Sequence, residues 1–234
     1  LIDSSKMKNL KVFFKTQYSE KYIAILAQKV ERNYIGVSGG IMDQMVSSIG
    51  IHRKAFFLNC QSLKYELLEI PSNWKFCLVD SEVQRNLRDS SYNERYNQLK
   101  KAEENIGVEY LGSVDINNFD SNNFDDPIVY KRAKHVVTEN KRVLDAKKSL
   151  LENNIDKFGQ LMNESHCSYS KDFEASTKDV DIIVERSVNA GAIGSRLTGG
   201  GFGGFTVSLI NINNYDEWFK SMNKYYSLDK FFEV

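Results

Sequence analysis

The 234-residue sequence has little proline and little cysteine, and it has no long apolar run. With only two prolines, few helix breaks are obligatory, so the spacing of apolar residues has to locate the helices and strands. The three cysteines form no CxxC pair, which argues against a dense disulfide framework and favours a reducing compartment. Because the sequence has neither a stretch of about 18 apolar residues nor a secretory leader, we expect a cytoplasmic protein without a membrane span.

The charged residues balance, since 31 Lys and Arg side chains oppose 31 Asp and Glu side chains. A net charge of zero removes the attraction to phosphate backbones and to anionic bilayers, so neither a nucleic acid nor a membrane is an expected partner. With 41% hydrophobic and 26% charged residues, the composition is typical of a globular protein with a sizeable core. The length suits one large domain or two small ones.

The order of predicted elements mixes helices with strands, and no repeat of fixed period occurs, which favours an α+β or mixed α/β architecture. The helices are located by the helical spacing of apolar residues and by N-caps at Ser19 and Asp126. The strands are located by short apolar or alternating runs. The helices are predicted over 22–30, 41–49, 91–107, 127–151, 155–169 and 215–226, and the strands over 55–60, 65–70, 75–80, 205–210 and 230–234. The Asn- and Asp-rich stretch 115–126 is predicted to be a surface loop.

The run Thr198–Gly204 contains a formal GxGxxG match in Gly199, Gly201 and Gly204. A dinucleotide fingerprint must open a helix, whereas here an alternating strand follows, so we reject a Rossmann site. Neither a GxxxxGK[ST] loop nor the protein-kinase sequences HRD and DFG occur. The glycines suit either a backbone cradle for phosphate or a tight strand entry without a ligand, although such a run is entropically costly for a mere turn.

Two carboxylates near the N-terminal glycines are candidates for chemistry. Asp43 is predicted to lie in the first turn of a helix that follows the glycine turn 36–40, where it can act as a general base or simply interact with the helix dipole. Glu31 is predicted to lie at the edge of the buried face of the preceding helix. It can hold Mg²⁺ or form an ion pair with Lys or Arg.

Three further residues are weighed and set aside. His166 falls on the apolar stripe of its predicted helix, which favours a hydrogen-bonded core histidine. His135 and Glu139 lie four residues apart on the long helix, where they suit a surface pair or half of a metal site, but no further ligands follow at zinc spacing.

Taken together, these segments resemble the GHMP small-molecule kinase family, and among its members those that phosphorylate galactose. The similarity runs in order along nearly the whole chain, which makes it more specific than any single motif. The segments that carry it are 30–36 (VERNYIG), 40–44 (GIMDQ), 77–81 (CLVDS) with Arg85, 91–95 (SYNER), 132–140, 164–166 (ESH), 172–174 (DFE) and 196–204 (RLTGGGFGG).

The resemblance implies an enzyme that transfers phosphate from ATP, with Mg²⁺, to the anomeric hydroxyl of D-galactose. By this similarity Asp43 is the catalytic aspartate and also contacts the sugar, Gly40 and Tyr92 contact the sugar, and Glu31 is associated with Mg²⁺. The phosphate-binding glycines are Gly199, Gly200, Gly201, Gly203 and Gly204. Phosphoryl transfer needs mainly positioning and charge neutralisation, so one carboxylate, one metal and a backbone cradle are sufficient.

The resemblance also implies a two-domain α+β architecture. Residues 1–65 correspond to the remnant of an N-terminal domain that resembles domain 2 of ribosomal protein S5, and residues 66–234 to a C-terminal domain with a ferredoxin-like α/β sandwich. The family's first motif and its Ser-rich ATP loop have no counterpart, and residues 1–15 do not resemble them. We therefore expect an N-terminally truncated, monomeric fragment with little activity of its own.

Two alternative functions remain open. One is a kinase for N-acetylgalactosamine or another sugar, because the residues that choose the sugar lie largely in the missing motif. The other is a galactose sensor without catalysis, against which the presence of Asp43 argues. Any of these readings requires that folding bring Asp43 close to the glycine run.

Overall fold

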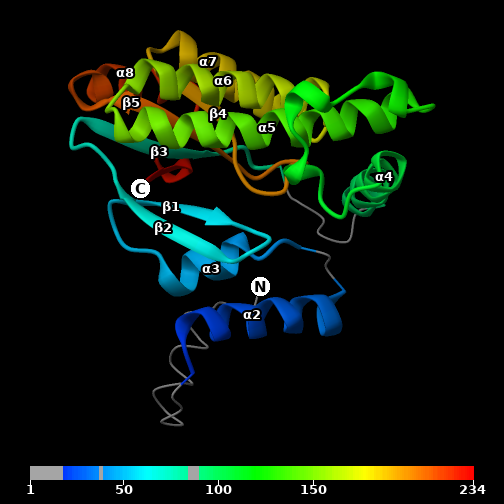
Figure 1. The fold of residues 1–234 in the computed structure, drawn as a ribbon. Helices are drawn as coiled ribbons and strands as arrows, with labels where there is room; N and C mark the ends of the chain where they lie inside the picture. The colour runs from blue at the N-terminus through cyan, green and yellow to red at the C-terminus, as the bar shows by residue number, and fades with distance from the viewer. Residues whose placement is uncertain (1–17, 37–38, 84–89) are drawn as a thin grey trace. The chain divides into compact units, whose positions relative to one another are not determined.

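The computed structural model describes residues 18–36, 39–83 and 90–234, with residues 1–17, 37–38 and 84–89 outside the described part (Figure 1). Arg85, residues 1–15 and the middle of the glycine turn, residues 37–38, therefore lie outside it. The chain divides into two compact units, Leu1–Ile70 and Pro71–Val234. The division falls after Ile70 rather than after residue 65, because the strand that contains residue 65 pairs along its whole length within the first unit.

In the residues that the structure describes, the first unit contains two helices and a β-hairpin. These are α2 (Glu20–Val30), which continues as the π-helical turn η1 (Glu31–Ile35), α3 (Met42–Ile49), and the antiparallel strands β1 (Lys54–Asn59) and β2 (Lys64–Glu69). The hydroxyl of Ser19 accepts a hydrogen bond from the amide of Tyr22 at 3.2 Å, which confirms the predicted N-cap. Gly36, in the left-handed conformation with φ 79°, ends the first helical segment.

The small core of the first unit lies where α2, α3 and the hairpin meet. Ala24, Ile41 and Met45 are buried there, and Phe56 and Leu58 of β1 pack against them. Polar contacts also tie α2 to the rest of this unit. The Ser48 hydroxyl donates to the Glu20 carbonyl at 2.9 Å, the Lys21 ammonium to the Leu63 carbonyl at 3.2 Å, and the Gln28 amide to the Gly39 carbonyl at 3.2 Å.

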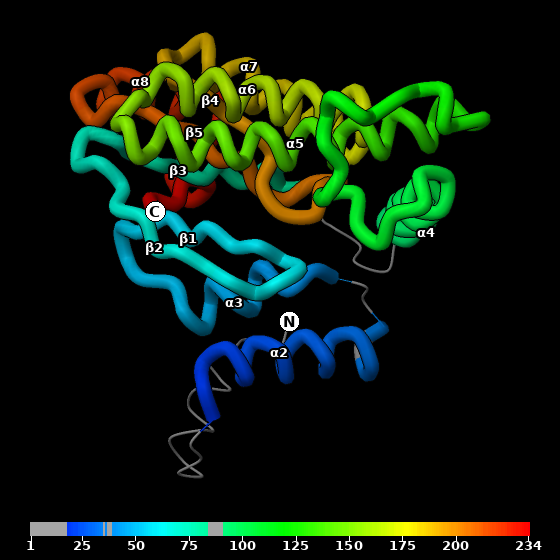
Figure 2. The backbone as a smooth tube through the Cα atoms, viewed as in Figure 1, coloured from blue at the N-terminus to red at the C-terminus, as the bar shows by residue number. Residues whose placement is uncertain are grey.

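The second unit is built on a four-stranded antiparallel sheet in the order β4-β5-β3-β6. Its helices α6, α7 and α8 contact the sheet, while α5 packs on α6 and α4 packs on α5 (Figures 1 and 2). The bounds are β3 Trp74–Asp80, α4 Ser90–Ile106, α5 Pro127–Leu151, α6 Ile155–Lys171, α7 Lys178–Asn189, β4 Gly194–Leu197, β5 Phe205–Asn211, α8 Tyr215–Met222 and β6 Phe231–Glu233. Together with the first unit, this arrangement confirms the α+β class.

The long helix α5 begins as the sequence predicts. The carboxylate of Asp126 accepts a hydrogen bond from the Ile128 amide at 2.9 Å, and Pro127 occupies the first helical position. The predicted surface loop 115–126 is exposed for most of its length, but it includes two 3₁₀ turns, Ile116–Asn118 and Ser121–Asn123.

Helix α6 lies unusually close to strand β4. A Cβ atom on Gly194 would come within 2.4 Å of the Gly159 carbonyl oxygen, so glycine is needed at this crossing. The α6 side chains also pair with the backbone of β4, which stands at the end of the strand order. The amide of Ser195 donates to Asn163 Oδ1 at 2.9 Å, and that of Leu197 to His166 Nδ1 at 3.3 Å. The interpretation of His166 as a hydrogen-bonded core histidine is thus confirmed.

The interpretation of His135 and Glu139 as a surface pair or half of a metal site is wrong. Both side chains face α6, because α5 packs along that helix on this side. His135 is 5% exposed and its Nδ1 lies 3.0 Å from the Ser168 hydroxyl. Glu139 accepts hydrogen bonds from Arg196 at 2.8 Å and Arg142 at 2.7 Å.

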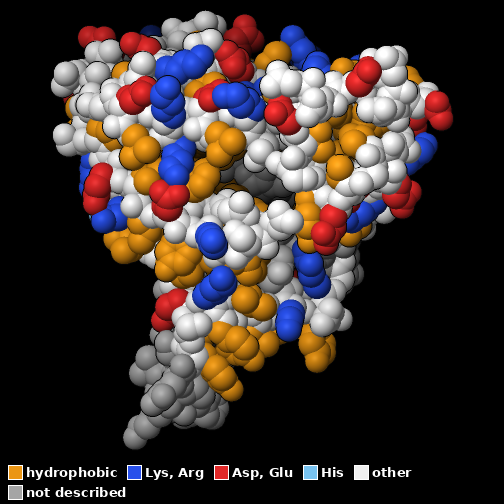
Figure 3. Space-filling model, viewed as in Figure 1, with side chains coloured by type: hydrophobic (Ala, Val, Ile, Leu, Met, Phe, Trp, Pro, Cys, Tyr) orange, Lys and Arg blue, Asp and Glu red, His pale blue; other side chains and the backbone are white. Residues whose placement is uncertain are grey.

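None of the helices in the described part of the chain is both long and apolar enough to cross a membrane. On the face that Figure 3 shows, side chains of both charges are interspersed, as the balanced composition predicts.

The buried His135 makes stability depend on pH. Burial lowers the pKa of His135 to about 4, from 6.5 for an ordinary histidine. Between these two values the unfolded chain binds a proton that the folded chain does not, so folding stability falls as the pH falls from about 6.5 towards 4. We expect this residue alone to cost about 2 kcal/mol between pH 7.5 and pH 5.

Urea unfolding of the wild type and of His135→Asn at both pH values measures this cost, because contributions from the carboxylates cancel in the difference between the two proteins. The variant should be less stable at pH 7.5 but should lose less stability on acidification. Equal losses in the two proteins would contradict the prediction.

Candidate functional site

The start of α3 is held in place by side chains from α2 and η1. The carbonyl of Gly39 accepts hydrogen bonds from Gln28 Nε2 at 3.2 Å and from Arg32 Nε and Nη2 at 3.1 and 2.9 Å. Asp43 follows in the first turn of α3 and is exposed, and a Cβ atom on Gly40 would meet nothing within 4 Å. The two residues therefore present an accessible carboxylate and an accessible stretch of backbone next to each other.

Glu31 is buried at 6% exposure, deeper than the predicted edge position. Its Oε2 accepts a hydrogen bond from Gln44 Nε2 at 2.6 Å, rather than pairing with Lys or Arg among the described residues. The other amide atom, Gln44 Oε1, is buried and has no hydrogen-bond partner in the described part of the chain. A carboxylate and an unpaired amide oxygen are ligand types that Mg²⁺ accepts. No cluster of three or more His, Cys, Asp or Glu side chains that could hold a metal occurs among the described residues.

The glycine run forms the connection between β4 and β5. The amide of Thr198 donates to the Phe205 carbonyl at 2.9 Å, so the two strands remain paired up to the loop. Inside the loop φ is positive at Gly199, Gly201, Gly203 and Gly204, and also at Phe202 with 58°. The predicted strand after the run is confirmed, and this agrees with the rejection of a dinucleotide fingerprint.

Part of the loop backbone is fixed by neighbouring segments. The amide of Phe202 donates to the Ala175 carbonyl at 2.7 Å, and the amide of Gly204 donates to the Val83 carbonyl at 3.1 Å. By contrast, the amides at 199–201 donate to no backbone carbonyl in the ranges that the structure describes. The run is therefore a tight hairpin connection that leaves successive amides available for an anion, and phosphate binding by these amides stays a prediction.

Two tyrosines flank this loop. A Cβ atom on Gly200 would lie 3.3 Å from Cε2 of Tyr92, at the start of α4, and the Tyr169 hydroxyl donates to the Gly199 carbonyl at 3.5 Å. The structure thus brings Tyr92 next to the glycine run. Asp43, Gly40 and Glu31 belong to the first unit, and their proximity to the run stays a prediction.

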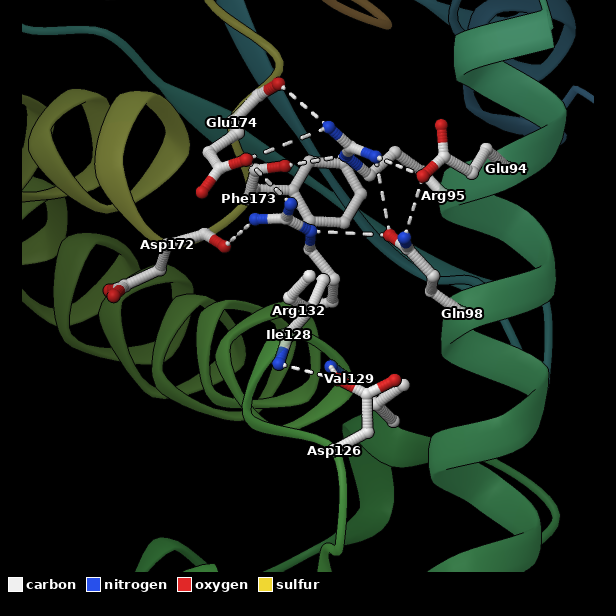
Figure 4. Close-up of polar contacts among 10 residues, drawn as sticks. All are labelled: Glu94, Arg95, Gln98, Asp126, Ile128, Val129, Arg132, Asp172, Phe173 and Glu174. Carbon is white, nitrogen blue, oxygen red and sulfur yellow. Dashed lines mark hydrogen bonds and ion pairs between the residues drawn. The ribbon is translucent and has the colours of Figure 1, made fainter.

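Sequence reasoning assigned no role to Arg95, Arg132 and Glu174, although all three belong to the segments that carry the family resemblance. In the structure their side chains converge on the backbone between α6 and α7 (Figure 4). Arg132 is 2% exposed, which is rare for an arginine, but its burial becomes visible only in the structure.

Comparisons with known proteins identify the family. Residues 6–50 match the N-terminal domain of GHMP kinases, and residues 146–225 match the C-terminal region of GHMP kinases. The chain belongs to the GHMP kinase family. Within the family, a galactokinase of Clostridium perfringens (strain SM101) is 37% identical over 230 residues, and one of Lactococcus lactis subsp. cremoris is 34% identical over 221 residues.

These matches cover 94% and 91% of this chain, but 59% and 55% of the two relatives, so the chain spans somewhat more than half of their length. Among solved structures, Lactococcus lactis galactokinase complexed with galactose has a TM-score of 0.89 at 30% identity, covering 96% of this chain and 61% of the other. L. major mevalonate kinase in complex with R-mevalonate has a TM-score of 0.65 at 16% identity. This match covers 99% of this chain and 62% of the other, and it shows the shared fold.

We expect Gly201→Ala to destabilise the second unit, because position 201 has φ 87° and a Cβ atom there would lie 2.5 Å from the Ala175 carbonyl oxygen. The strain should cost roughly 1–3 kcal/mol. Gly200→Ala is the matched control, since φ there is not positive and the nearest atom is a ring carbon of Tyr92. Urea unfolding measures the loss of stability in both variants. A larger loss for Gly200→Ala than for Gly201→Ala would contradict the close packing of Gly201 against Ala175.

Proposed function

We propose that the protein is a galactokinase, which transfers the γ-phosphoryl group of ATP to the anomeric hydroxyl of D-galactose. The observation that carries the proposal is the similarity to Lactococcus lactis galactokinase, at a TM-score of 0.89 and 30% identity, whose structure contains galactose. The two galactokinase relatives, at 37% and 34% identity, support it further. Because the chain spans only part of these relatives, the activity is proposed for the whole protein from which it comes.

In the proposed reaction, Asp43 accepts or orients the proton of the attacking hydroxyl, and its exposure at the start of α3 supports this role. Gly40 contacts the sugar through its backbone, and Tyr92 contacts it through its hydroxyl. The amides at 199–201 hold the phosphates, supported by their lack of backbone acceptors among the described residues. This assignment requires the two units to bring Asp43 and the glycine run to one site.

Among the described residues, Glu31 and its neighbour Gln44 offer oxygen ligands that fit a magnesium ion. Glu31 and the unpaired Gln44 Oε1 would supply two oxygen ligands, leaving the remaining positions to water and to nucleotide phosphates. When bound, the ion would neutralise charge on the transferring phosphoryl group.

The proposed substrates are the small molecules D-galactose and ATP. A cytoplasmic location and a monomeric state remain predictions from the sequence.

We expect Asp43→Asn to lower kcat by at least about a hundredfold while it leaves galactose binding nearly unchanged, because the substitution removes the proton acceptor but keeps the shape. The assay follows galactose 1-phosphate formation from ATP and Mg²⁺, with N-acetylgalactosamine tested in parallel. It uses the complete reading frame, including any residues encoded before Leu1.

Asp216→Asn is the matched control, since Asp216 is likewise an exposed carboxylate in the first turn of an eight-residue helix, α8. Unchanged turnover in Asp43→Asn would remove Asp43 from the mechanism. Binding of galactose without turnover in the wild type would instead favour the sensor.

We expect Glu31→Gln to raise the Mg²⁺ concentration for half-maximal activity by about tenfold or more, because a neutral amide is a weaker ligand for a divalent cation. Glu66→Gln, on the exposed strand β2 of the same unit, should leave this value unchanged. Activity measured against Mg²⁺ at a fixed ATP concentration provides the comparison. Identical Mg²⁺ dependence in both variants would exclude Glu31 as a ligand.

A further inference from the structure

The segment between α6 and α7 has an unusual pattern of hydrogen bonds. Each of its four successive carbonyls, at residues 172–175, accepts a hydrogen bond from a donor outside the segment, and Figure 4 shows the bonds to the first three. The donors are Arg132 Nη1 to Asp172 at 2.6 Å, Arg95 Nε to Phe173 at 2.7 Å, Arg95 Nη2 to Glu174 at 3.2 Å, and the Phe202 amide to Ala175 at 2.7 Å. Two arginines thus bind three of the carbonyls, and the glycine loop binds the fourth through the Phe202 amide.

Ending helix α6 does not require these contacts. The carbonyls left open at the end of a helix belong to its last turn, and here the Ser168 carbonyl accepts from the Asp172 amide at 2.8 Å and the Tyr169 carbonyl from the Ala175 amide at 3.2 Å. The carbonyls that the arginines hold lie beyond the last helical residue, Lys171. Their pairing fixes the course of the connection rather than the helix.

The two guanidinium groups lie close together and are balanced by their surroundings. Both donate to Gln98 Oε1, each at 3.2 Å. The Glu174 carboxylate lies 2.7 Å from Arg132 Nη2 and 4.0 Å from Arg95 Nη2. Arg132 lowers the pKa of Glu174, while burial and then repulsion from Arg132 lower the pKa of Arg95. Two like charges share one site because a carboxylate and three carbonyls oppose them.

The position of Ala175 is transmitted directly to the glycine loop. Ala175 is fully buried, and a Cβ atom on Gly201 would lie 2.9 Å from its side chain, so the two backbones are in close contact. The guanidinium of Arg95 also lies 6.0 Å from the ring centre of Phe202. Tyr92, one turn before Arg95 on α4, lies against Gly200. The same helix therefore reaches the loop at two points.

We propose that Arg95, Arg132 and Glu174 form an arginine clamp that positions the glycine loop for phosphate binding. They are positioning residues, which act through the Ala175 carbonyl and need not touch the nucleotide. The clamp depends on the planar, forked geometry of guanidinium, which binds several acceptors at once, so lysine cannot replace it. The effect on phosphate binding rests on the proposed function, whereas the effect on the loop does not.

The experiment compares Arg132→Lys and the milder, isosteric Glu174→Gln with Glu103→Gln. Glu103 is the matched control, because it also forms an ion pair, with Lys100 of α4 at 2.6 Å, but among the described residues its side chain is not bonded to the two arginines or to residues 172–175. Hydrogen exchange measured by NMR on residues 1–234 should be about tenfold faster at the Phe202 amide in both clamp variants, and within about twofold of wild type in the middle of α6. The control should match the wild type at both places.

Kinetics of the complete reading frame supply a second readout. The clamp variants should raise KM for ATP about fivefold and leave KM for galactose within about twofold, a split that general destabilisation would not produce. Unchanged exchange at Phe202 in both variants would overturn the clamp, as would faster exchange throughout α6. Faster exchange at Phe202 with an unchanged KM for ATP would overturn its role in phosphate binding. Absence of galactose phosphorylation in the wild type would defeat the proposed function, while the exchange measurement would still decide the clamp.

Discussion

The hydrogen bond from the Phe202 amide to the Ala175 carbonyl is the contact on which the geometry of the glycine loop depends. Glycine gives a chain freedom, and a run of glycines loses more conformational entropy on ordering than any other sequence. A loop of this composition has no preferred shape of its own. Its shape must come from rigid neighbours, and Ala175 supplies one because it is fully buried and its segment is bonded to Arg95 and Arg132.

The strand that leads into the loop is held with similar care. β4 is only four residues long and stands at the end of the strand order, so its own ladder fixes it weakly. Helix α6 compensates by packing backbone against backbone at Gly159 and Gly194, and by accepting the amides of Ser195 and Leu197 with Asn163 and His166. Glu139 of α5, the helix that packs on α6, also pairs with Arg196 of β4. The entrance to the loop is therefore anchored by the helix layer as well as by its pairing with β5.

Much of the fold could be predicted from local signals in the sequence. Ser19 and Asp126 cap the helices that they were expected to cap, and alternating residues marked β1, β2, β3 and β5. Helix α7 and strand β4 were missed. The sequence of β4, GSRL, is too short to show alternation, and its strand identity comes from pairing with β5. Such tertiary determination is invisible to propensity and periodicity.

The residues of the candidate site likewise divide into those that local sequence signals reveal and those that only tertiary contacts reveal. Local chemistry marks the glycine run and Asp43, because glycines and a carboxylate in a first helical turn are recognisable without a fold. The supports of the loop are not local: Arg95 bonds to a residue 78 positions away and Arg132 to one 42 positions away, and an arginine on a polar helix gives no sign of such a partner. The groups proposed to contact a ligand can thus be named from sequence, whereas those that hold them in place follow only from coordinates. In the proposed phosphoryl transfer, which depends on positioning as well as on electrostatic stabilisation, the second set matters as much as the first.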